Sequence, residues 1–532
     1  MTEEIRKYKI WEPVLLSLAA VIGMIAGVKF ARTESPSHRK EPIVSSTRYS
    51  GRQVEEIIRF LETRYVGDVS SDELVQKAID AIMSGLDPHT HYFPPDQMDE
   101  LEERTMGHYV GIGIEIAFIH DSLVVLYPKK ESPASMAGIV PGDYIVAIDG
   151  IPVPQDTLDH KEVIDMIKGT KGTKLELTLK PMLSNQTKKV EVIRDEIKVP
   201  SVPAAYMLDS SIAYIKLDRF INSSYKEFMD QWEKLSTANH AKHLILDLRD
   251  NPGGYLKEAV NMLSQMFEEE GKLLVYTKGK NQERYEYKST GKVFFPIDHI
   301  AILINEKSAS ASEIIAGCIQ DHDRGWVIGS RSFGKGLVQE QFDLSNGGIL
   351  RMTVSRYYTP SGRMIQKAYE SLSVVDTNLI FRTSGGRTVH AGGGIIPDIE
   401  VSDPVNWERP EMMRWMDIIS EYAIRYNLVT YQGKIISVNE IPSIRKSLPP
   451  SDQMLADLKT LALKRTTAAQ LDTLMAVMDQ EPEQLARIAE ATLIAYRAGE
   501  EGWYRAFNED DPVIRKAKEM IKLDLLTALR ED

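Results

Sequence analysis

A cluster of three serines, Ser308-Ala-Ser310-Ala-Ser312, follows a short apolar run that ends at Ile304. The run predicts a strand and the residues after Ser310 predict a helix, so the cluster lies at a strand-to-helix turn. A hydroxyl there is exposed, beside the free N–H groups and the positive end of the helix dipole. The pattern suits a serine nucleophile, although Ser310 with Glu313 also matches an ordinary capping box.

A nucleophilic serine requires a base, and the chain has no Gly-x-Ser-x-Gly pentapeptide of the kind that histidine-dependent hydrolases carry. Instead, Lys335 lies among glycines after the strand-like run Trp326-Val-Ile-Gly329. A lysine enclosed there loses hydration, which lowers its pKa and lets it act as a neutral base. Gln339 lies on the same side of an extended segment and could orient the amine. The alternative for Lys335 is an ordinary surface lysine.

The segment from Gly329 to Lys335 also matches most of a Walker A phosphate loop, but Gly336 stands where that loop needs Ser or Thr. A phosphate loop must be followed by a helix. Here, residues 338–344 and 349–354, separated by a Ser-Asn-Gly-Gly turn, predict a β-hairpin. A nucleotide site is therefore disfavoured.

A pair of glycines, Gly253 and Gly254, ends the segment Leu246-Asp-Leu-Arg-Asp-Asn-Pro-Gly-Gly254. Paired glycines after a strand can point main-chain N–H groups into a cleft, as an oxyanion hole requires. By itself the segment is also compatible with a simple tight turn.

Short apolar alternations between about residues 106 and 196 predict the strands of a small module. Its segment Ser132–Gly150, with Gly111, Ile112, Gly113 and Ile114 before it, closely resembles a PDZ domain. That fold captures peptide C-termini by strand addition, with backbone N–H groups around the carboxylate. The alternative is a β-rich spacer without a ligand.

The elements around these motifs predict five segments. They are an N-terminal signal or anchor with its linker (1–44), a helical region (45–105), the PDZ-like module (106–196), an α/β layer (197–402) and a helical C-terminal region (403–532). Within 52–86 the apolar spacing indicates a pair of amphipathic helices, and in the α/β layer strand-like and helical runs alternate.

The composition excludes several classes of protein. The 532 residues, 43% hydrophobic and 27% charged, describe a folded multidomain chain. A formal charge of −13 disfavours nucleic acid as a partner. The single cysteine, Cys318, excludes disulfide frameworks and Cys-rich zinc sites.

The N-terminus carries Arg6, Lys7 and Lys9 before a charge-free run at 13–28, which predicts a signal-peptide core or a short membrane anchor. We favour an uncleaved anchor, because no clean cleavage site follows; a buried core helix is the alternative. The preceding positive charges predict that the remainder faces outward.

In this order the motifs resemble the C-terminal processing peptidases, or tail-specific serine proteases, over roughly residues 50 to 402. The matching segments are Leu86-Asp-Pro-His-Thr-His-Tyr92, the PDZ-like stretch, Arg249–Gly254, Ser308–Glu313, Phe333–Gln339, Tyr358–Arg363 and Gly394–Asp398. The resemblance implies a crotonase-like (ClpP/crotonase-type) α/β peptidase core with an inserted PDZ domain, N-terminal helices and a C-terminal helical region.

By that resemblance Ser310 is the nucleophile, Lys335 the base and Gln339 its positioning partner, with Ser308 and Ser312 as fallback nucleophiles. The oxyanion hole would use the Ala311 N–H and that of Gly253 or Gly254, a choice that the sequence leaves open.

Several features depart from the family pattern. Thr90 replaces the usual serine, and Lys168 replaces an arginine linked to gating by the PDZ domain; lysine keeps the charge but loses the fork. The insert Lys367–Gly393 has no assigned role. His89, His91, His108 and His120 could be assembled into a metal site on paper, but His-x-His at a proline-rich turn is more often structural.

We therefore expect a periplasmic serine endopeptidase, tethered to the inner membrane by residues 13–28, that cleaves envelope proteins near their C-termini. Its PDZ domain would bind the apolar tail of the substrate through Gly111–Ile114 and Lys168. No cofactor or metal is expected, and a homodimer is possible. The alternatives are an inert peptide-binding scaffold and an acyl-transfer enzyme with the same core.

Overall fold

A computed structural model describes residues 51–98, 107–119, 122–153, 160–182, 184–280, 282–368, 379–402, 405–431 and 437–531. The predicted membrane segment 13–28 lies outside these ranges, as does His120. Among the helices within them, none is both long and apolar enough to cross a membrane.

The chain divides into two compact units, Met1–Ile82 and Met83–Asp532. The described part of the first contains α2 (Gly51–Arg64) and most of α3 (Ser71–Ser84), the two amphipathic helices that the apolar spacing predicts. All further elements belong to the second unit. The division into five segments stays a prediction.

The β-rich module of the second unit is built on a six-stranded sheet in the order β3-β4-β5-β7-β8, with β6 paired to β5, and on a small β2-β9 pair. Alternation explains these strands: Leu175, Leu177 and Leu179 of one strand are all fully buried in the module's core. Among the described strands, β3 pairs only with β4, so it is an edge strand. The elements are β2 (His108–Gly111), β3 (Ile114–Ile119), β4 (Ser122–Pro128), α5 (Pro133–Met136), β5 (Asp143–Ile148), β6 (Ile151–Pro152), α6 (His160–Ile167), β7 (Lys174–Pro181), β8 (Lys188–Ile193) and β9 (Asp195–Lys198).

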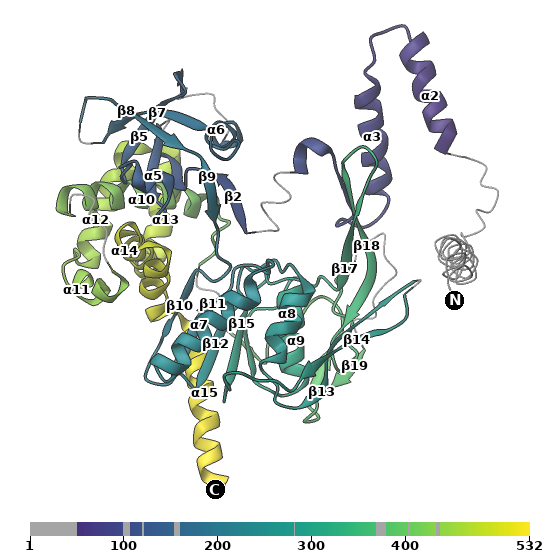
Figure 1. The fold of residues 1–532 in the computed structure, drawn as a ribbon. Helices are drawn as coiled ribbons and strands as arrows, with labels where there is room; N and C mark the ends of the chain where they lie inside the picture. Colours follow the sequence, from purple (N-terminus) through teal and green to yellow (C-terminus); the bar gives the residue numbers. More distant parts are fainter. Residues whose placement is uncertain are drawn as a thin grey trace, which may run out of the picture. The chain divides into compact units, whose positions relative to one another are not determined.

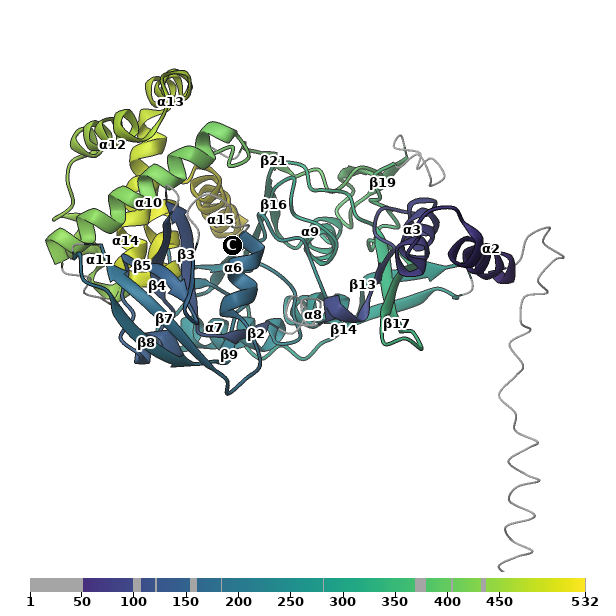
Figure 2. The ribbon, with the colours of Figure 1, turned by 90° about the horizontal axis from the view of Figure 1, so that it is seen from above.

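A central sheet in the order β10-β11-β12-β15-β16-β21 forms the core of the α/β layer, and its strands from β11 to β21 run parallel. Continuous apolar runs form these strands because both faces are covered. Helices α7, α8 and α9 cover one face and α15 covers the other (Figures 1 and 2). The elements are β10 (Ala204–Met207), β11 (Ile212–Lys216), α7 (Ser224–Ala238), β12 (His243–Asp247), α8 (Leu256–Ser264), β15 (Ile300–Ile304), α9 (Ala311–Asp321), β16 (Trp326–Gly329), β21 (Ile399–Glu400) and α15 (Pro512–Glu531).

A second, antiparallel sheet has the order β1-β18-β13-β14, with β17 paired to β18. Its strands are β1 (His91–Phe93), β13 (Glu270–Gly279), β14 (Tyr285–Thr290), β17 (Leu337–Asp343) and β18 (Ile349–Tyr358), and the short helix η1 (Pro95–Gln97) follows β1. The hairpin β17-β18 confirms the predicted hairpin, so the segment after Lys335 lacks the helix that a phosphate loop needs. A small pair, β19 (Ile380–Arg382) and β20 (Thr388–His390), lies in the insert, of which residues 369–378 are outside the described part.

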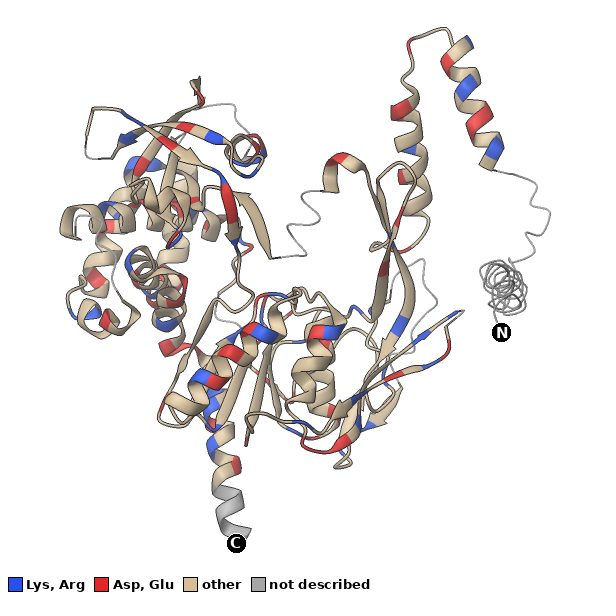
Figure 3. Ribbon diagram, in the orientation of Figure 1, with Lys and Arg blue, Asp and Glu red and all other residues tan. Residues whose placement is uncertain are grey.

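The C-terminal region is helical, as its sequence predicts. Its elements before α15 are α10 (Pro410–Tyr431), η2 (Val438–Glu440), α11 (Ile441–Arg445), α12 (Ser451–Arg465), α13 (Ala468–Gln480), α14 (Pro482–Phe507) and η3 (Asn508–Asp510). They surround a core that includes the fully buried Trp415, and Val124 of the β-rich module is buried in the same cluster. Charged side chains of both signs are scattered over these helices (Figure 3).

Gly325 precedes β16, and a Cβ there would lie 2.2 Å from the carbonyl oxygen of Ile300. Because that oxygen belongs to the neighbouring strand, we expect Gly325→Ala to lower the free energy of unfolding by about 2–3 kcal/mol in urea titrations. Gly271→Ala is the control: its φ is +80° but nothing lies within 4 Å, so only backbone strain of about 1 kcal/mol is expected. Equal losses of unfolding free energy in the two variants would contradict the close approach of the strands at Gly325.

Candidate active site

Three adjacent parallel strands end at the same edge of the central sheet. The turn after β15 carries Ser310, the loop after β16 carries Lys335, and the segment after β12 carries Gly253 and Gly254. All four residues line one cavity of about 1130 Å³. The carboxyl edge of a parallel sheet is where side chains from separate strands converge.

Ser310 begins helix α9 with φ 54° and ψ −112°, a conformation that residues other than glycine rarely adopt. The other two serines of the cluster are both fully buried. The Ser308 hydroxyl donates to the Leu248 carbonyl (2.8 Å), and the Ser312 hydroxyl donates to the Asn251 carbonyl (3.0 Å). Of the three serines, therefore, Ser310 lines the cavity.

Lys335 and Gln339 form a hydrogen-bonded pair in the same cavity. The Lys335 Nζ donates to the Gln339 Oε1 at 2.9 Å, and the Gln339 Nε2 donates to the main-chain carbonyl of His89. Burial lowers the pKa of Lys335, and the nearby Arg351 lowers it further, while Asp87 and Glu313 act in the opposite direction. This environment favours a neutral amine more than water does.

The Glu313 carboxylate, fully buried on α9, joins the turn of Ser310 to the loop of Lys335. Its Oε2 accepts the N–H groups of Ser310 (2.9 Å) and Lys335 (2.8 Å), and its Oε1 accepts the Ser332 hydroxyl (2.6 Å) and the Gly334 N–H (2.7 Å). Burial raises the pKa of Glu313, and these hydrogen bonds offset part of the rise. The capping box foreseen at Ser310 thus has a second role that the sequence did not reveal.

Tyr357, on β18, makes a second link between the same two segments. Its buried hydroxyl lies 3.1 Å from the Ser310 carbonyl oxygen and 2.6 Å from that of Lys335. Both backbones are therefore held from the N–H side by Glu313 and from the carbonyl side by Tyr357.

The turn at Asp87 holds His89, whose main-chain carbonyl accepts the hydrogen bond from Gln339. The Asp87 carboxylate accepts the Thr90 hydroxyl (2.8 Å), the His89 N–H (3.0 Å) and the Thr353 hydroxyl (3.1 Å). Burial would raise the pKa of Asp87, but these hydrogen bonds outweigh it and the pKa is lowered. Thr90 supplies the same hydroxyl that a serine would, so this departure from the family motif leaves the turn intact.

The two glycines differ in how their main-chain N–H groups are used. The Gly253 N–H donates to the Asn251 Oδ1 at 2.8 Å, and the Gly253 carbonyl accepts the Phe220 N–H at 3.0 Å. In the planar trans peptide the Gly254 N–H points to the opposite side, away from Phe220. Among the residues that the structure describes, neither this N–H nor that of Ala311 has an acceptor. A Cβ on Gly253 would lie 2.9 Å from the Ala311 nitrogen, so the two segments are in contact.

The predicted peptide-binding residues of the β-rich module lie where β2 passes into the edge strand β3. Gly111 ends β2 and Ile114 begins β3. The ammonium groups of Lys129 and Lys168 lie 5.4 and 5.6 Å from the ring centre of Tyr109 on β2. Positive charge and an open strand edge therefore occur together there.

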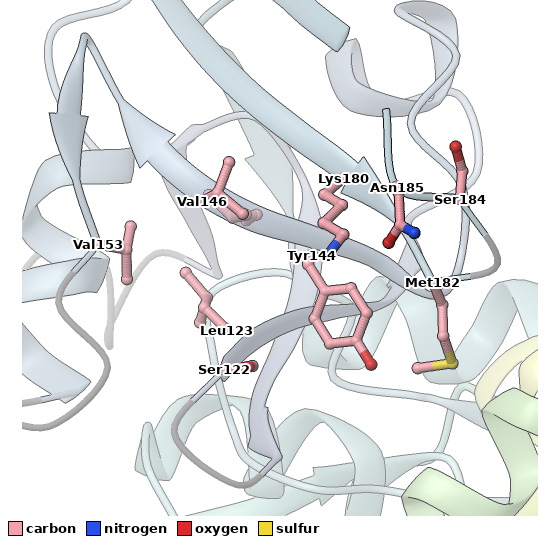
Figure 4. Close-up of a pocket in the computed structure, with 10 residues that line it drawn as sticks. Ser122, Leu123, Tyr144, Val146, Val153, Lys180, Met182, Ser184 and Asn185 are labelled. Atoms are coloured by element: carbon pink, nitrogen blue, oxygen red, sulfur yellow. The ribbon is translucent and has the colours of Figure 1, made fainter. Parts of the chain in front are cut away.

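A separate cavity of about 500 Å³ in this module lies beside β4, β5 and β7 (Figure 4). Tyr144, Val146, Lys180 and Met182 line it together with Ser184 and Asn185, and it contains none of the predicted site residues.

Of the histidines raised as possible metal ligands, His89, His91 and His108 lie in the described part of the chain, and His120 lies outside it. Within the described ranges, no group of three or more His, Cys, Asp or Glu side chains is arranged to hold a metal ion. His89 contributes its backbone to the turn under Gln339, and His91 lies in β1.

Comparison with known proteins gives a consistent result. The model of peptidase family S41 matches residues 211–371, and a PDZ domain model matches residues 124–181. A carboxy-terminal-processing protease of Bartonella bacilliformis is 33% identical over 369 residues, which cover 68% of this chain and 76% of the relative. A probable CtpA-like serine protease of Staphylococcus epidermidis is 30% identical over 399 residues, covering 75% and 74%.

Among solved structures, the photosystem II D1 C-terminal processing protease is 26% identical, with a TM-score of 0.35, covering 66% of this chain and 93% of its own. A putative S41 protease from Bacteroides fragilis is 12% identical, with a TM-score of 0.40, covering 71% and 99%.

Replacing Glu313 tests its link between the two segments. In Glu313→Gln an amide NH₂ must face at least one main-chain N–H, so we expect a loss of about 2–3 kcal/mol in the free energy of unfolding. Glu306→Gln is the control on the same turn, because Glu306 is exposed and accepts a 3.1 Å hydrogen bond from the Ser330 hydroxyl. We expect the free energy of unfolding of this control to stay within about 0.5 kcal/mol of that of the parent. Indistinguishable urea midpoints for the two variants would show that Glu313 does not stabilise this link.

Proposed function

Because this chain belongs to peptidase family S41 and is a serine-type peptidase of the carboxy-terminal-processing kind, we propose that Ser310 is its nucleophile and Lys335 its general base. The family and the fold class predicted from the motifs are confirmed. The observation that carries the assignment of roles is the convergence of Ser310 and a half-buried Lys335 on one cavity, with both backbones held by Glu313.

The reaction begins when neutral Lys335 takes the proton of the Ser310 hydroxyl and the oxygen attacks the scissile carbonyl. Gln339 accepts one N–H of the amine and keeps it in place. The N–H groups of Ala311 and Gly254 bind the oxyanion, since neither is used within the described structure. The Lys335 ammonium then protonates the leaving amine, which gives an acyl-enzyme, and Lys335 next activates the water that hydrolyses the ester.

The PDZ module selects the substrate by its free C-terminus. The tail adds as a strand to the open edge of β3, and its carboxylate lies at residues 111–114, near the ammonium groups of Lys129 and Lys168. Apolar tail residues are the expected ligands. We further propose, from the sequence of residues 13–28, that the enzyme is anchored in a membrane and acts on envelope proteins.

The full-length protein is expected to cleave an unstructured polypeptide with an apolar C-terminus, with fragments followed by mass spectrometry. Ser310→Ala and Lys335→Ala should each lose at least about 10³-fold in kcat/KM, whereas Ser330→Ala, a control in the loop of Lys335, should keep full activity. Chelators should have no effect, and amidation of the substrate's C-terminus should raise KM.

Undiminished cleavage by Ser310→Ala would mean that another residue is the nucleophile. Binding of the tail without cleavage by the parent would favour an inert scaffold, and transfer of the acyl group to an added amine without hydrolysis would indicate an acyltransferase.

The pH profile tests Lys335 as the base. Since only the neutral amine is active, kcat/KM should fall as pH decreases through the Lys335 pKa, which burial lowers. In Gln339→Glu a carboxylate replaces the amide oxygen that accepts from the Lys335 Nζ, favours the ammonium and raises that pKa, so the acidic limb should move to higher pH. Gln341→Glu, two residues along the same strand and in the same cavity, is the matched control and should shift the limb less. If the acidic limb of the profile fell at the same pH in Gln339→Glu and in the parent, Lys335 would be excluded as the titrating base.

A further inference from the structure

The C-terminal helical region reaches the glycine-bearing loop through a buried ion pair. Arg249 immediately precedes the segment 250–254, here called the glycine loop. Its Nη1 donates to Asp511 at 2.8 Å, and its Nη2 and Nε donate to Asp247 at 2.6 and 3.0 Å. Asp511 is fully buried and lies 262 residues further along the chain.

Asp511 is itself held in place at the start of α15. Its Oδ1 accepts the N–H groups of Val513 (2.8 Å) and Ile514 (3.2 Å), which leaves Oδ2 for Arg249. The apolar face of α15, including Ala517 and Ile521, is buried against the face of the central sheet opposite α9. The carboxylate therefore has little freedom to follow Arg249 if the loop moves.

Two cations, Arg249 and Lys216, lie among three carboxylates, those of Asp247, Asp511 and Asp218. Lys216 donates to the Arg249 carbonyl and lies 3.9 Å from Asp247 and 3.6 Å from Asp218. Burial acts to raise the pKa of Asp247, but Arg249 and Lys216 outweigh it and hold the pKa at about 2. Removing one carboxylate would leave a buried guanidinium partly unpaired, and such a group moves toward solvent or another acceptor.

Arg249 is joined directly to the glycine loop by a peptide bond, so a movement of its backbone would displace Asp250 and Asn251. Other segments hold the loop as well: the Gly253 carbonyl accepts the Phe220 N–H and the Asn251 carbonyl accepts the Ser312 hydroxyl, each at 3.0 Å. The Asp250 N–H donates to Asn305 (2.8 Å), and the Asn251 side chain donates to the Leu217 carbonyl (2.8 Å). The Ala309 N–H donates to the Asn251 carbonyl (3.0 Å), which connects the loop to the turn of Ser310. The arginine thus adjoins the start of the loop, and Gly253 near its end lies against Ser310.

Resting on the proposed function, we propose that Asp511 is a positioning residue for the oxyanion hole. Through Arg249 it holds the glycine loop so that the Gly254 N–H points at the oxyanion. The C-terminal helical region thereby completes the active site, although it supplies no group that touches the substrate.

The test uses the full-length protein with Asp511→Asn. The Asn Oδ1 can still cap α15, but its NH₂ replaces the acceptor that faces Arg249, so the ion pair is lost and a donor meets a donor. We expect kcat to fall by about 10- to 100-fold while KM changes by less than about 3-fold, because the loss concerns the transition state. Asp510→Asn is the matched control: Asp510 is the adjacent, exposed residue, and we expect it to leave kcat unchanged.

Hydrogen exchange of residues 250–254, followed by mass spectrometry, gives a readout that does not require catalysis. Exchange there should accelerate in Asp511→Asn and stay at the parent rate in Asp510→Asn. Asp511→Ser, which keeps a capping hydroxyl and also lacks the carboxylate, provides a second variant if the asparagine protein fails to fold.

The outcomes separate the two proposals. A lower melting temperature with unchanged kcat and unchanged exchange at 250–254 would make Asp511 merely structural and would overturn the inference. If the parent itself cleaves nothing, the proposed function fails, and the exchange measurement alone still decides whether Asp511 holds the loop.

Discussion

The arrangement of the site depends on one buried carboxylate. Glu313 receives N–H groups from both Ser310 and Lys335, so the turn after β15 and the loop after β16 share a single acceptor oxygen. A fully buried carboxylate is stable only when its oxygens are hydrogen-bonded, and four donors supply that here. The buried carboxylate requires hydrogen-bond donors from both segments, and this requirement keeps the nucleophile and the base close together. Tyr357 repeats the constraint from the carbonyl side.

The rest of the site follows from the topology of the central sheet. Because β12, β15 and β16 are adjacent and parallel, their carboxyl ends deliver the glycine loop, Ser310 and Lys335 to one edge. Gln339 and Tyr357 come from the second sheet, and His89, the partner of Gln339, comes from the turn before β1, which pairs with that same sheet. The short segment 87–93 is thereby part of the peptidase core, although it lies before the PDZ module in the sequence.

The helical C-terminal region contributes on two sides. Its bundle buries Val124 of the PDZ module in the cluster around Trp415. Its last helix, α15, covers the open face of the central sheet and brings Asp511 to Arg249. Helix α14 is kinked at Gly499 (φ 72°), and residues on both sides of the kink, such as Ile494 and Phe507, are buried in that same cluster.

Much of the site could be predicted from local sequence. Ser310, Lys335 and Gln339 stand out because strand-to-helix turns, flanking glycines and residue spacing are local properties, and the hairpin after Lys335 was predictable because its turn residues and alternation are local as well. Tertiary structure alone decided which serine faces the cavity, since Ser308 and Ser312 turn inward to carbonyls of a neighbouring segment. It also decided that Gly254 has the available N–H, because the Asn251 side chain occupies that of Gly253. The links through Glu313 and Asp511 join segments that only packing brings together, and periodicity reports which face of an element is buried but not which distant group it meets.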